Sequence, residues 1–308
     1  MAVPNLSAED VSQIIADCKV VGKCNRGGQK IVYPCEINGI KYAVKFILLN
    51  YLDLDLDKDN DNDEYYIHIE EVKARAEREI SIMKSLDSPY LIRIGKIDLT
   101  STEYKNQNLL FYSEDWVEGD DISTILRKNG PMDVKDALKL SKDIATAISQ
   151  IWDTNNVHRD IKPQNIMKRS SDNTYVLLDF GMAFDLDDKS LTQVGLVPGT
   201  KIYLSPEQLH WQKKRDIDFR SDLFSLGIVI YETLTGCHPF YEHGMTDLEL
   251  FNRILTYTPS EPQVINTNIG KEENDIVMRL LAKEPHGRYR KCSILIKQLQ
   301  AILQTMEV

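Results

Sequence analysis

The chain has 308 residues, of which 42% are hydrophobic and 27% are charged, a balance typical of a folded globular protein. Lysine and arginine together number 37 against 47 aspartates and glutamates, so the formal net charge is −10. This acidic balance argues against binding to a nucleic-acid backbone, which depends on clustered basic side chains.

The cysteines and the apolar runs indicate where such a chain would work. The five cysteines show no C-x-x-C spacing, which favours reduced thiols over a zinc site or a disulfide framework. The longest apolar run, at 223–234, is shorter than a membrane span and contains Ser225 and Glu232. The first ten residues lack the basic start and apolar core of a secretory signal. We therefore expect a cytoplasmic protein with no membrane partner and no nucleic-acid partner.

The first part of the chain predicts a short helix followed by strands. Residues 7–17 have Ser7 as an N-cap and an apolar stripe, the pattern of an amphipathic helix. Residues 31–33 and 42–47 are rich in β-formers and flank the turn pair Asn38-Gly39, which predicts a hairpin. Further strands are expected at 91–97 and 109–113, which would complete a five-stranded antiparallel sheet.

An acidic segment interrupts this pattern at 50–69. Its alternating carboxylates repel one another, which predicts a mobile, solvated insertion. A calcium loop is the alternative, because Asp57-x-Asp59-x-Asp61 matches the start of an EF-hand. Asn62 stands where that loop needs glycine and His68 where it needs a bidentate glutamate, so we favour the insertion. The acidic residues are Asp53, Asp55, Asp57, Asp59, Asp61, Asp63 and Glu64.

Helical periodicity dominates the remainder. Apolar positions three and four apart predict helices at 70–86, 122–128, 133–153 and 293–305. Between the last two of these, 166–167 and 176–178 read as a short strand pair, and 222–234 as a buried apolar helix.

The run His158-Arg159-Asp160-Ile161-Lys162-Pro163-Gln164-Asn165 places a carboxylate, an ammonium and an amide within six positions of one loop. Asp160 can orient a hydroxyl, Lys162 can neutralise a phosphoryl group and Asn165 can hold a divalent metal. Fourteen residues later comes Asp179-Phe180-Gly181, a second acidic motif. In this order and spacing, the two motifs resemble the catalytic loop and the metal-binding signature of the eukaryotic-type (Hanks-type) serine/threonine protein kinases, a family with bacterial members.

The resemblance implies an α+β, bilobal fold. A small lobe of five antiparallel strands and a regulatory helix would be joined by a hinge to a large, mainly helical lobe. The expected boundaries are an N-terminal helical extension at 1–18, the small lobe at 19–114, the hinge at 115–119 and the large lobe at 120–308. Asp222 would brace the catalytic loop, and Arg288 would pair with Glu207 of the run Ser205-Pro206-Glu207.

The resemblance also implies roles for individual side chains. Lys45 would hold the nucleotide phosphates and pair with Glu79, with Glu77 as the competitor for that pairing. In the glycine-rich turn at 25–32, Lys30 replaces a glycine, so its backbone approaches phosphates less closely. The expected catalytic set is Asp160, Lys162, Lys45, Glu79 and Thr200, and the metal ligands are Asn165 and Asp179. The nucleotide would contact Asn25, Gly27, Val32, Ala43, Lys45, Asp115, Val117, Asp121 and Met167; a phosphate on Ser190 or Thr192 would pair with Arg159.

These roles predict an enzyme that uses ATP and Mg²⁺, or Mn²⁺, to phosphorylate serine and threonine hydroxyls of protein substrates and of itself. The thinned glycine turn keeps a pseudokinase scaffold as the alternative, since fold and activity are separable. A small-molecule phosphotransferase is a further alternative, which Gly199-Thr200 and the Glu207–Arg288 pair disfavour. The sequence indicates no oligomeric state.

Overall fold

The computed structural model describes residues 5–27, 30–49, 62–180, 184–185, 201–209 and 217–306. The chain divides into two compact units, each considered by itself. The first, the small unit, comprises Met1–Asp87 and Ile92–Val117, and the second, the large unit, comprises Ser88–Leu91 and Glu118–Val308.

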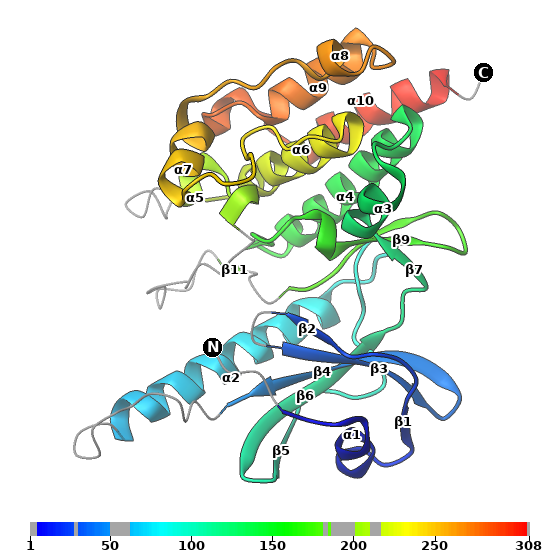
Figure 1. Cartoon of the computed structure of the whole chain (residues 1–308), viewed down its shortest axis with the longest axis vertical. Coiled ribbons are helices and arrows are strands. Elements are labelled where there is room, and N and C mark those ends of the chain that lie inside the picture. The colour runs from blue at the N-terminus through cyan, green and yellow to red at the C-terminus, as the bar shows by residue number, and fades with distance from the viewer. Residues whose placement is uncertain are drawn as a thin grey trace. The chain divides into compact units, whose positions relative to one another are not determined.

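The small unit is an antiparallel sheet with two helices (Figure 1). Its order is β1-β3-β4-β6-β5, and β2 pairs with the same strand as β1, so the sheet is five strands wide. The helices are α1 (Ala8–Ile14) and α2 (Asn62–Ser85). The strands are β1 (Cys18–Val20), β2 (Asn25–Gly27), β3 (Lys30–Ile37), β4 (Ile40–Leu48), β5 (Thr100–Tyr104) and β6 (Gln107–Asp115).

Local sequence explains the hairpin between β3 and β4. Asn38 and Gly39 have φ values of 53° and 81°, the left-handed conformation that a tight hairpin turn requires. The register runs from Ile37 opposite Ile40 to Lys30 opposite Ile47. The turn predicted from the Asn-Gly pair is confirmed.

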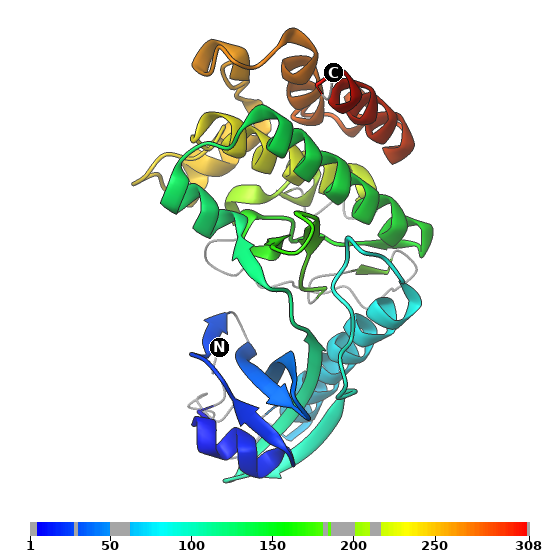
Figure 2. The same cartoon turned by 90° about the vertical axis from the view of Figure 1, so that its right-hand side faces the viewer.

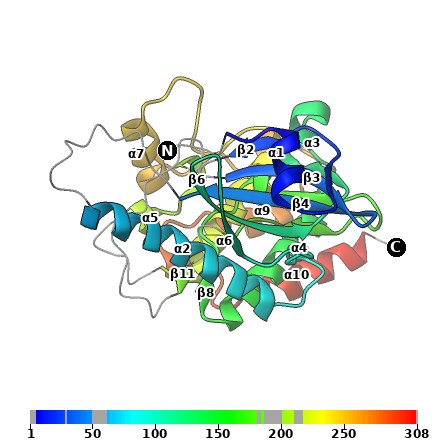
Figure 3. The ribbon, with the colours of Figure 1, turned by 90° about the horizontal axis from the view of Figure 1, so that it is seen from below.

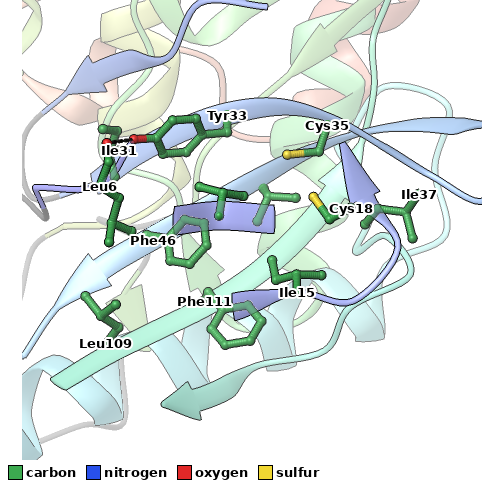
Figure 4. Close-up of a cluster of buried hydrophobic side chains, with 12 residues drawn as sticks. Leu6, Ile15, Cys18, Ile31, Tyr33, Cys35, Ile37, Phe46, Leu109 and Phe111 are labelled. Atoms are coloured by element: carbon green, nitrogen blue, oxygen red, sulfur yellow. Dashed lines mark hydrogen bonds between the residues drawn. The ribbon is translucent and has the colours of Figure 1, made fainter. Parts of the chain in front are cut away.

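Helix α1 covers one face of this sheet (Figures 3 and 4). Ser7 caps it, accepting from the amide of Asp10, whose own carboxylate accepts from the Ser7 amide, so the predicted N-cap is confirmed. Asp10 also accepts a hydrogen bond from the ammonium of Lys105. This bond is the main reason why the pKa of Asp10 lies below its usual range. The cluster beneath the helix combines Leu6, Val11 and Ile15 with Ile31, Tyr33, Cys35, Phe46, Leu109 and Phe111.

One predicted strand is wrong. Residues 91–97 form no ladder, and only single bridges occur there, at Leu91 and Ile94. Both the amide of Ile97 and the amide of Gly95 bond to Ser113, and a Cβ at Gly95 would lie 2.8 Å from the Ser113 hydroxyl. The segment bonds β6 only at Ser113 and at Asp115, whose amide donates to the Arg93 carbonyl, without forming a continuous ladder. Its apolar side chains therefore mark core rather than sheet.

The large unit is mainly helical, with three small strand pairings. Helix α4 (Val134–Asp153) packs against α6 (Phe219–Thr235) and α10 (Cys292–Thr305), as Figure 2 shows. Asp133 caps α4, and α6 is buried along nearly its whole length. The other helices are α3 (Ile122–Asn129), α5 (Pro206–Leu209), α7 (Asp247–Thr256), α8 (Pro262–Ile265) and α9 (Lys271–Leu280), and the strands are β7 (Gly119–Asp121), β8 (Asn156–Val157), β9 (Ile166–Arg169), β10 (Tyr175–Leu177) and β11 (Phe184–Asp185).

The predicted α+β class is thus confirmed by a sheet-based unit and a helical unit. In the described ranges, no helix is both long enough and apolar enough to cross a lipid bilayer.

A buried ion pair joins two segments of the large unit that are far apart in the sequence. The fully buried guanidinium of Arg288 donates to both carboxylate oxygens of Glu207, at 2.7 and 2.9 Å, which confirms the predicted pair. Burial alone would raise the pKa of Glu207, but the hydrogen bonds and charge of Arg288 hold it below its usual value. Arg288 also donates to the carbonyls of Arg220, Ala282 and Lys283, so its remaining protons are bonded.

Replacing Arg288 should therefore destabilise the large unit strongly. Arg288→Met leaves Glu207 as a buried carboxylate without its cation, a change that typically costs about 3–5 kcal/mol of unfolding free energy. The measurement is urea denaturation followed by circular dichroism. The control is Lys271→Met, which removes the pair with Asp275; their side chains are 84% and 57% exposed, so a change below about 0.5 kcal/mol is expected. Equal losses in the two variants contradict the role given to Arg288.

Candidate active site

The loop at 158–165 lies between two strands of the large unit. It follows β8, contains one turn of 3-10 helix at Pro163–Asn165 and leads into β9. Pro163 suits the first position of that turn, because its fixed φ fits and its missing N–H is not needed there. The loop therefore has fixed ends, and its polar side chains project from a defined backbone.

Asp222 of α6 holds this loop through its backbone. Its carboxylate accepts from the amide of His158 at 2.8 Å and from the amide of Arg159 at 2.7 Å. Burial raises the pKa of the Asp222 carboxyl, while the two amide bonds oppose that rise. Arg159 has φ +67°, a strained value for a non-glycine residue that these bonds maintain. The predicted brace is confirmed.

His158 ties the loop to the segment that carries the second motif. Its Nδ1 accepts from the amide of Asp160 at 3.3 Å, so its Nε2 carries the proton and donates to the carbonyl of Leu178 at 3.2 Å. The ring is fully buried and lies against Phe180, with centroids 5.4 Å apart. Burial lowers the pKa of His158, which favours the neutral ring that this bonding pattern needs.

The carboxylate of Asp160 is hydrogen-bonded by two side chains. Lys162 Nζ lies 2.9 and 2.8 Å from its two oxygens, and Asn165 Nδ2 donates to Oδ2 at 2.9 Å. Burial raises the pKa of Asp160 and the nearby charge of Asp179 adds to the rise, while Lys162 and Asn165 oppose it. The predicted catalytic pair Asp160 and Lys162 is therefore in direct contact.

Asn165 and Asp179 could hold a divalent metal. The amide of Leu178 donates to the carbonyl of Asn165 at 2.8 Å, which brings Asp179 beside the loop. Because Asn165 donates through Nδ2, its amide oxygen can serve as a ligand, and Asp179 supplies a carboxylate. Mg²⁺ in phosphoryl-transfer sites usually has one or two such ligands, with water and substrate phosphates completing its shell, so the pair fits this ion. Elsewhere too, the described residues hold no cluster of three or more His, Cys, Asp or Glu suited to a metal.

The predicted ion pair between Lys45 and Glu79 is not the one in the structure. Glu79 accepts from the ammonium of Lys30, and Lys45 pairs with Glu114 at 2.6 Å. Side-chain alternation gives the reason: Glu114 stands opposite Ala43, two residues from Lys45 on the same face, so its carboxylate is within reach. The other competitor considered, Glu77, is exposed.

The residues expected to line the nucleotide fall in both units. Val32 and Ala43 are half-buried on the same face of the small-unit sheet as Lys45. Asn25 and Gly27 pair with Val32 and Lys30 across β2 and β3.

Two of the other positions already have partners within the fold. The amide of Asp115 donates to the carbonyl of Arg93 at 3.0 Å. Asp121 caps α3 by accepting from the amide of Thr124 at 2.9 Å. Met167 is half-buried and lies opposite Asp121 in the pairing of β7 with β9, whereas Val117 is half-buried at the end of the small unit. Their roles toward a nucleotide stay predictions.

Some predicted positions lie outside the described residues. These are Thr200, Ser190 and Thr192, together with most of the acidic segment and the calcium loop weighed for it. The phosphate pocket expected at Arg159 therefore stays a prediction, although the backbone of Arg159 is placed.

Sequence reasoning did not anticipate the contacts of Lys30 and Tyr112 with Glu79. Tyr112 donates its hydroxyl to Glu79 at 2.8 Å and is fully buried. The sequence feature that indicates part of this arrangement is the alternation of side chains along a strand. It puts Tyr112, Glu114 and Lys45 on one face once the strands are paired.

Comparison with known proteins agrees with this geometry. A family model described as "Protein kinase domain" matches residues 27–299. A protein of Clostridium perfringens (strain 13 / Type A) named "Probable serine/threonine-protein kinase" is 30% identical over 233 residues, or 76% of this chain and 32% of that protein. Serine/threonine-protein kinase PknB of Mycobacterium leprae is 32% identical over 217 residues (70% and 34%), and PknH of Mycobacterium tuberculosis 31% over 220 (70% and 33%). The chain spans about a third of the length of these curated relatives.

Substituting Asp222 should loosen the loop without touching its polar side chains. In Asp222→Asn only one oxygen remains to accept from two amides, and each bond to a charged acceptor contributes about 1.5–3 kcal/mol. Hydrogen–deuterium exchange of a peptide covering 155–163 should speed up at least about tenfold. The matched control, Asp275→Asn on the exposed side of α9, should leave that peptide unchanged. Unaltered exchange in Asp222→Asn contradicts the bracing role.

Proposed function

Because this chain belongs to the protein kinase domain family, we propose that it transfers the γ-phosphate of Mg-ATP to serine or threonine hydroxyls of proteins. The observation that carries the proposal is the position of Asp160. Its carboxylate is hydrogen-bonded by Lys162 and Asn165, and burial and the nearby charge of Asp179 raise its pKa. The relatives that support serine and threonine as acceptors are named as kinases of that type.

The chemistry asked of these residues is mainly positioning and charge stabilisation. Asn165 and Asp179 would hold Mg²⁺, which supplies positive charge to the phosphate oxygens when bound. Asp160 would accept a hydrogen bond from the incoming hydroxyl and align it with the γ-phosphorus. Its ionised form is required, since a protonated carboxyl offers a donor where an acceptor is needed.

Lys162 has a second task in this arrangement. In the structure its ammonium bonds both oxygens of Asp160, at 2.9 and 2.8 Å. A phosphoryl group arriving beside Asp160 would bring negative charge within reach of the same ammonium. Lys162 would then stabilise charge on the transferring group while keeping Asp160 ionised.

Substitution of Asp160 tests the proposal. Asp160→Ala should lower phosphate transfer from radiolabelled ATP to a mixed protein substrate by about 10²–10⁴-fold, the usual contribution of a positioned acid or base. Binding of Mg-ATP and the melting temperature should stay close to those of the unaltered chain.

The control for this experiment is Asp275→Ala, on the exposed side of α9, which should transfer at the original rate. Undiminished transfer by Asp160→Ala contradicts the assignment. An unaltered chain that binds nucleotide but phosphorylates no protein, itself included, supports the scaffold alternative, and labelling of small molecules alone supports the small-molecule alternative.

The pH dependence of transfer should follow Asp160. Because burial raises its pKa above the ordinary 3.8, the fraction ionised falls at higher pH than for an exposed aspartate, and the acidic limb of kcat/KM shifts upward with it. In Lys162→Met the ammonium that lowers the pKa is lost, so the limb should move to still higher pH. Melting temperatures at each pH separate this effect from unfolding. A limb that stays in place in Lys162→Met contradicts the coupling.

A further inference from the structure

Two cysteines of the small unit lie on neighbouring strands. Cys18 is the first residue of β1, and it stands opposite Ile37 of β3, two residues from Cys35. Side chains alternate along a strand, so Ile37 and Cys35 point to the same face, and Cys18 shares that face with the residue opposite it. The two cysteines are therefore diagonal neighbours on one face of the sheet.

Their thiol groups are in contact. Figure 4 shows the two sulfur atoms beside each other, on the face of the sheet that α1 covers. The thiol of Cys35 donates a hydrogen bond to the sulfur of Cys18. This bond lowers the pKa of Cys18 and raises the pKa of Cys35, and the burial of Cys35 adds to its rise. Cys18 is therefore the first of the two to ionise, with Cys35 as its hydrogen-bond donor.

Both cysteines belong to the buried cluster beneath α1. Cys18 is 6% exposed and Cys35 is fully buried, and Val11 and Ile15 join the same cluster from α1 and its C-cap. The cover is short, because α1 has seven residues, and a helix of that length is stable only through its tertiary contacts. A small oxidant can therefore reach the thiols when α1 opens locally, while the sheet stays folded.

A covalent bond at this position would connect α1 and an edge strand to the middle of the sheet. Strand β1 lies at one end of the order β1-β3-β4-β6-β5, and it follows α1 directly, since the amide of Cys18 donates to the carbonyl of Ile15 at 3.3 Å. A bond from Cys18 to β3 would therefore fix both the edge strand and the end of the helix. The loop that it closes contains three positions expected to contact the nucleotide, Asn25, Gly27 and Val32.

We propose that Cys18 and Cys35 are a redox modification site, at which a hydroperoxide oxidises the two thiols to a reversible disulfide that fixes α1 and β1 to β3. The site needs no catalytic activity of the chain, so the proposal goes beyond the proposed function and does not rest on it.

The reaction has two steps. The Cys18 thiolate attacks one oxygen of the hydroperoxide, the O–O bond breaks, and the other oxygen takes a proton and leaves as an alcohol, or as water where the oxidant is hydrogen peroxide. The sulfur of Cys35 then attacks the sulfenic acid on Cys18, which forms the S–S bond and releases the remaining oxygen as water. The two thiols lose two electrons, and the two peroxide oxygens gain them. A dithiol reductant reverses the change by thiol–disulfide exchange.

Peptide mapping of the full chain tests the bond directly. Trypsin separates the cysteines of the small unit into three peptides, 1–19 with Cys18, 24–26 with Cys24 and 31–41 with Cys35. The folded chain is treated with hydrogen peroxide, alkylated without reduction and digested. We expect peptide 1–19 linked to peptide 31–41, with a mass lower by two hydrogens than their sum, and separation of the two by dithiothreitol. Separate alkylation of the two peptides, or a link to 24–26 as the main product, overturns the proposal.

Two controls distinguish this bond from general oxidation. Cys24→Ser removes the exposed cysteine that lies between the pair in the sequence, and it should leave the link unchanged. Cys292 is 4% exposed in the large unit, so it reports unfolding of the chain. It should stay unalkylated and unoxidised while the link forms. Modification of Cys292 at the same rate as the link contradicts a reaction in the folded protein.

Hydrogen–deuterium exchange tests whether the bond fixes α1. Amides of α1 should exchange several-fold more slowly in the linked chain than in the reduced chain, because Cys18 can no longer separate from β3 when the helix opens. In Cys35→Ala, peroxide should leave that exchange unchanged. Equal exchange in the linked and reduced forms of the unaltered chain refutes the fixing of α1. Neither readout measures phosphate transfer, so a failure of the proposed function and a failure of this inference are separate results.

Discussion

The large unit depends on one buried carboxylate that is matched by backbone amides. Asp222 accepts from the amides of His158 and Arg159, so its charge is hydrogen-bonded within the core. Bonds between amides and an ionised acceptor are stronger than neutral ones, and they offset the strain of Arg159 at φ +67°. With that backbone fixed, His158 reaches Leu178, and Asp160 meets Lys162 and Asn165. The backbone conformation of the loop thus depends on Asp222 of α6, which lies more than sixty residues further along the chain.

The small unit manages its charges differently. Its sheet has one apolar face under α1, and the opposite face carries Lys30, Lys45, Glu114 and Tyr112. Buried ion pairs stabilise a fold little compared with apolar packing, but they are costly to break one partner at a time. Pairs of this kind are better suited to fixing where each charged group lies than to holding the sheet together.

Sequence patterns predicted those features that depend on neighbouring residues. The Asn38-Gly39 turn, the cap at Ser7 and the helix that ends near Asp153 all follow from local backbone preferences. The polar groups of the loop at 158–165 could be listed from the motif, and Asp222 and Arg288 bond their predicted partners. These two contacts could be predicted because the motifs contain both partners of each.

What the sequence did not predict depends on register and packing. The apolar run at 91–97 has the composition of a strand, yet its amides bond to Ser113 and the ladder never forms. The predicted pairing of Lys45 with Glu79 is wrong because the partner of Lys45 depends on strand register and on where α2 lies, neither of which a motif encodes. The strand register, which places Glu114 diagonally across from Lys45, supplies that information.

The most direct test of the central claim, that Asn165 and Asp179 hold the metal of a bound nucleotide beside Asp160, is a crystal structure with Mn²⁺ and a non-hydrolysable ATP analogue. Anomalous scattering locates the manganese without ambiguity. The expected result is a metal bound by the Asn165 amide oxygen and the Asp179 carboxylate, with the terminal phosphate next to Asp160. A metal–nucleotide complex bound away from these three residues would contradict it.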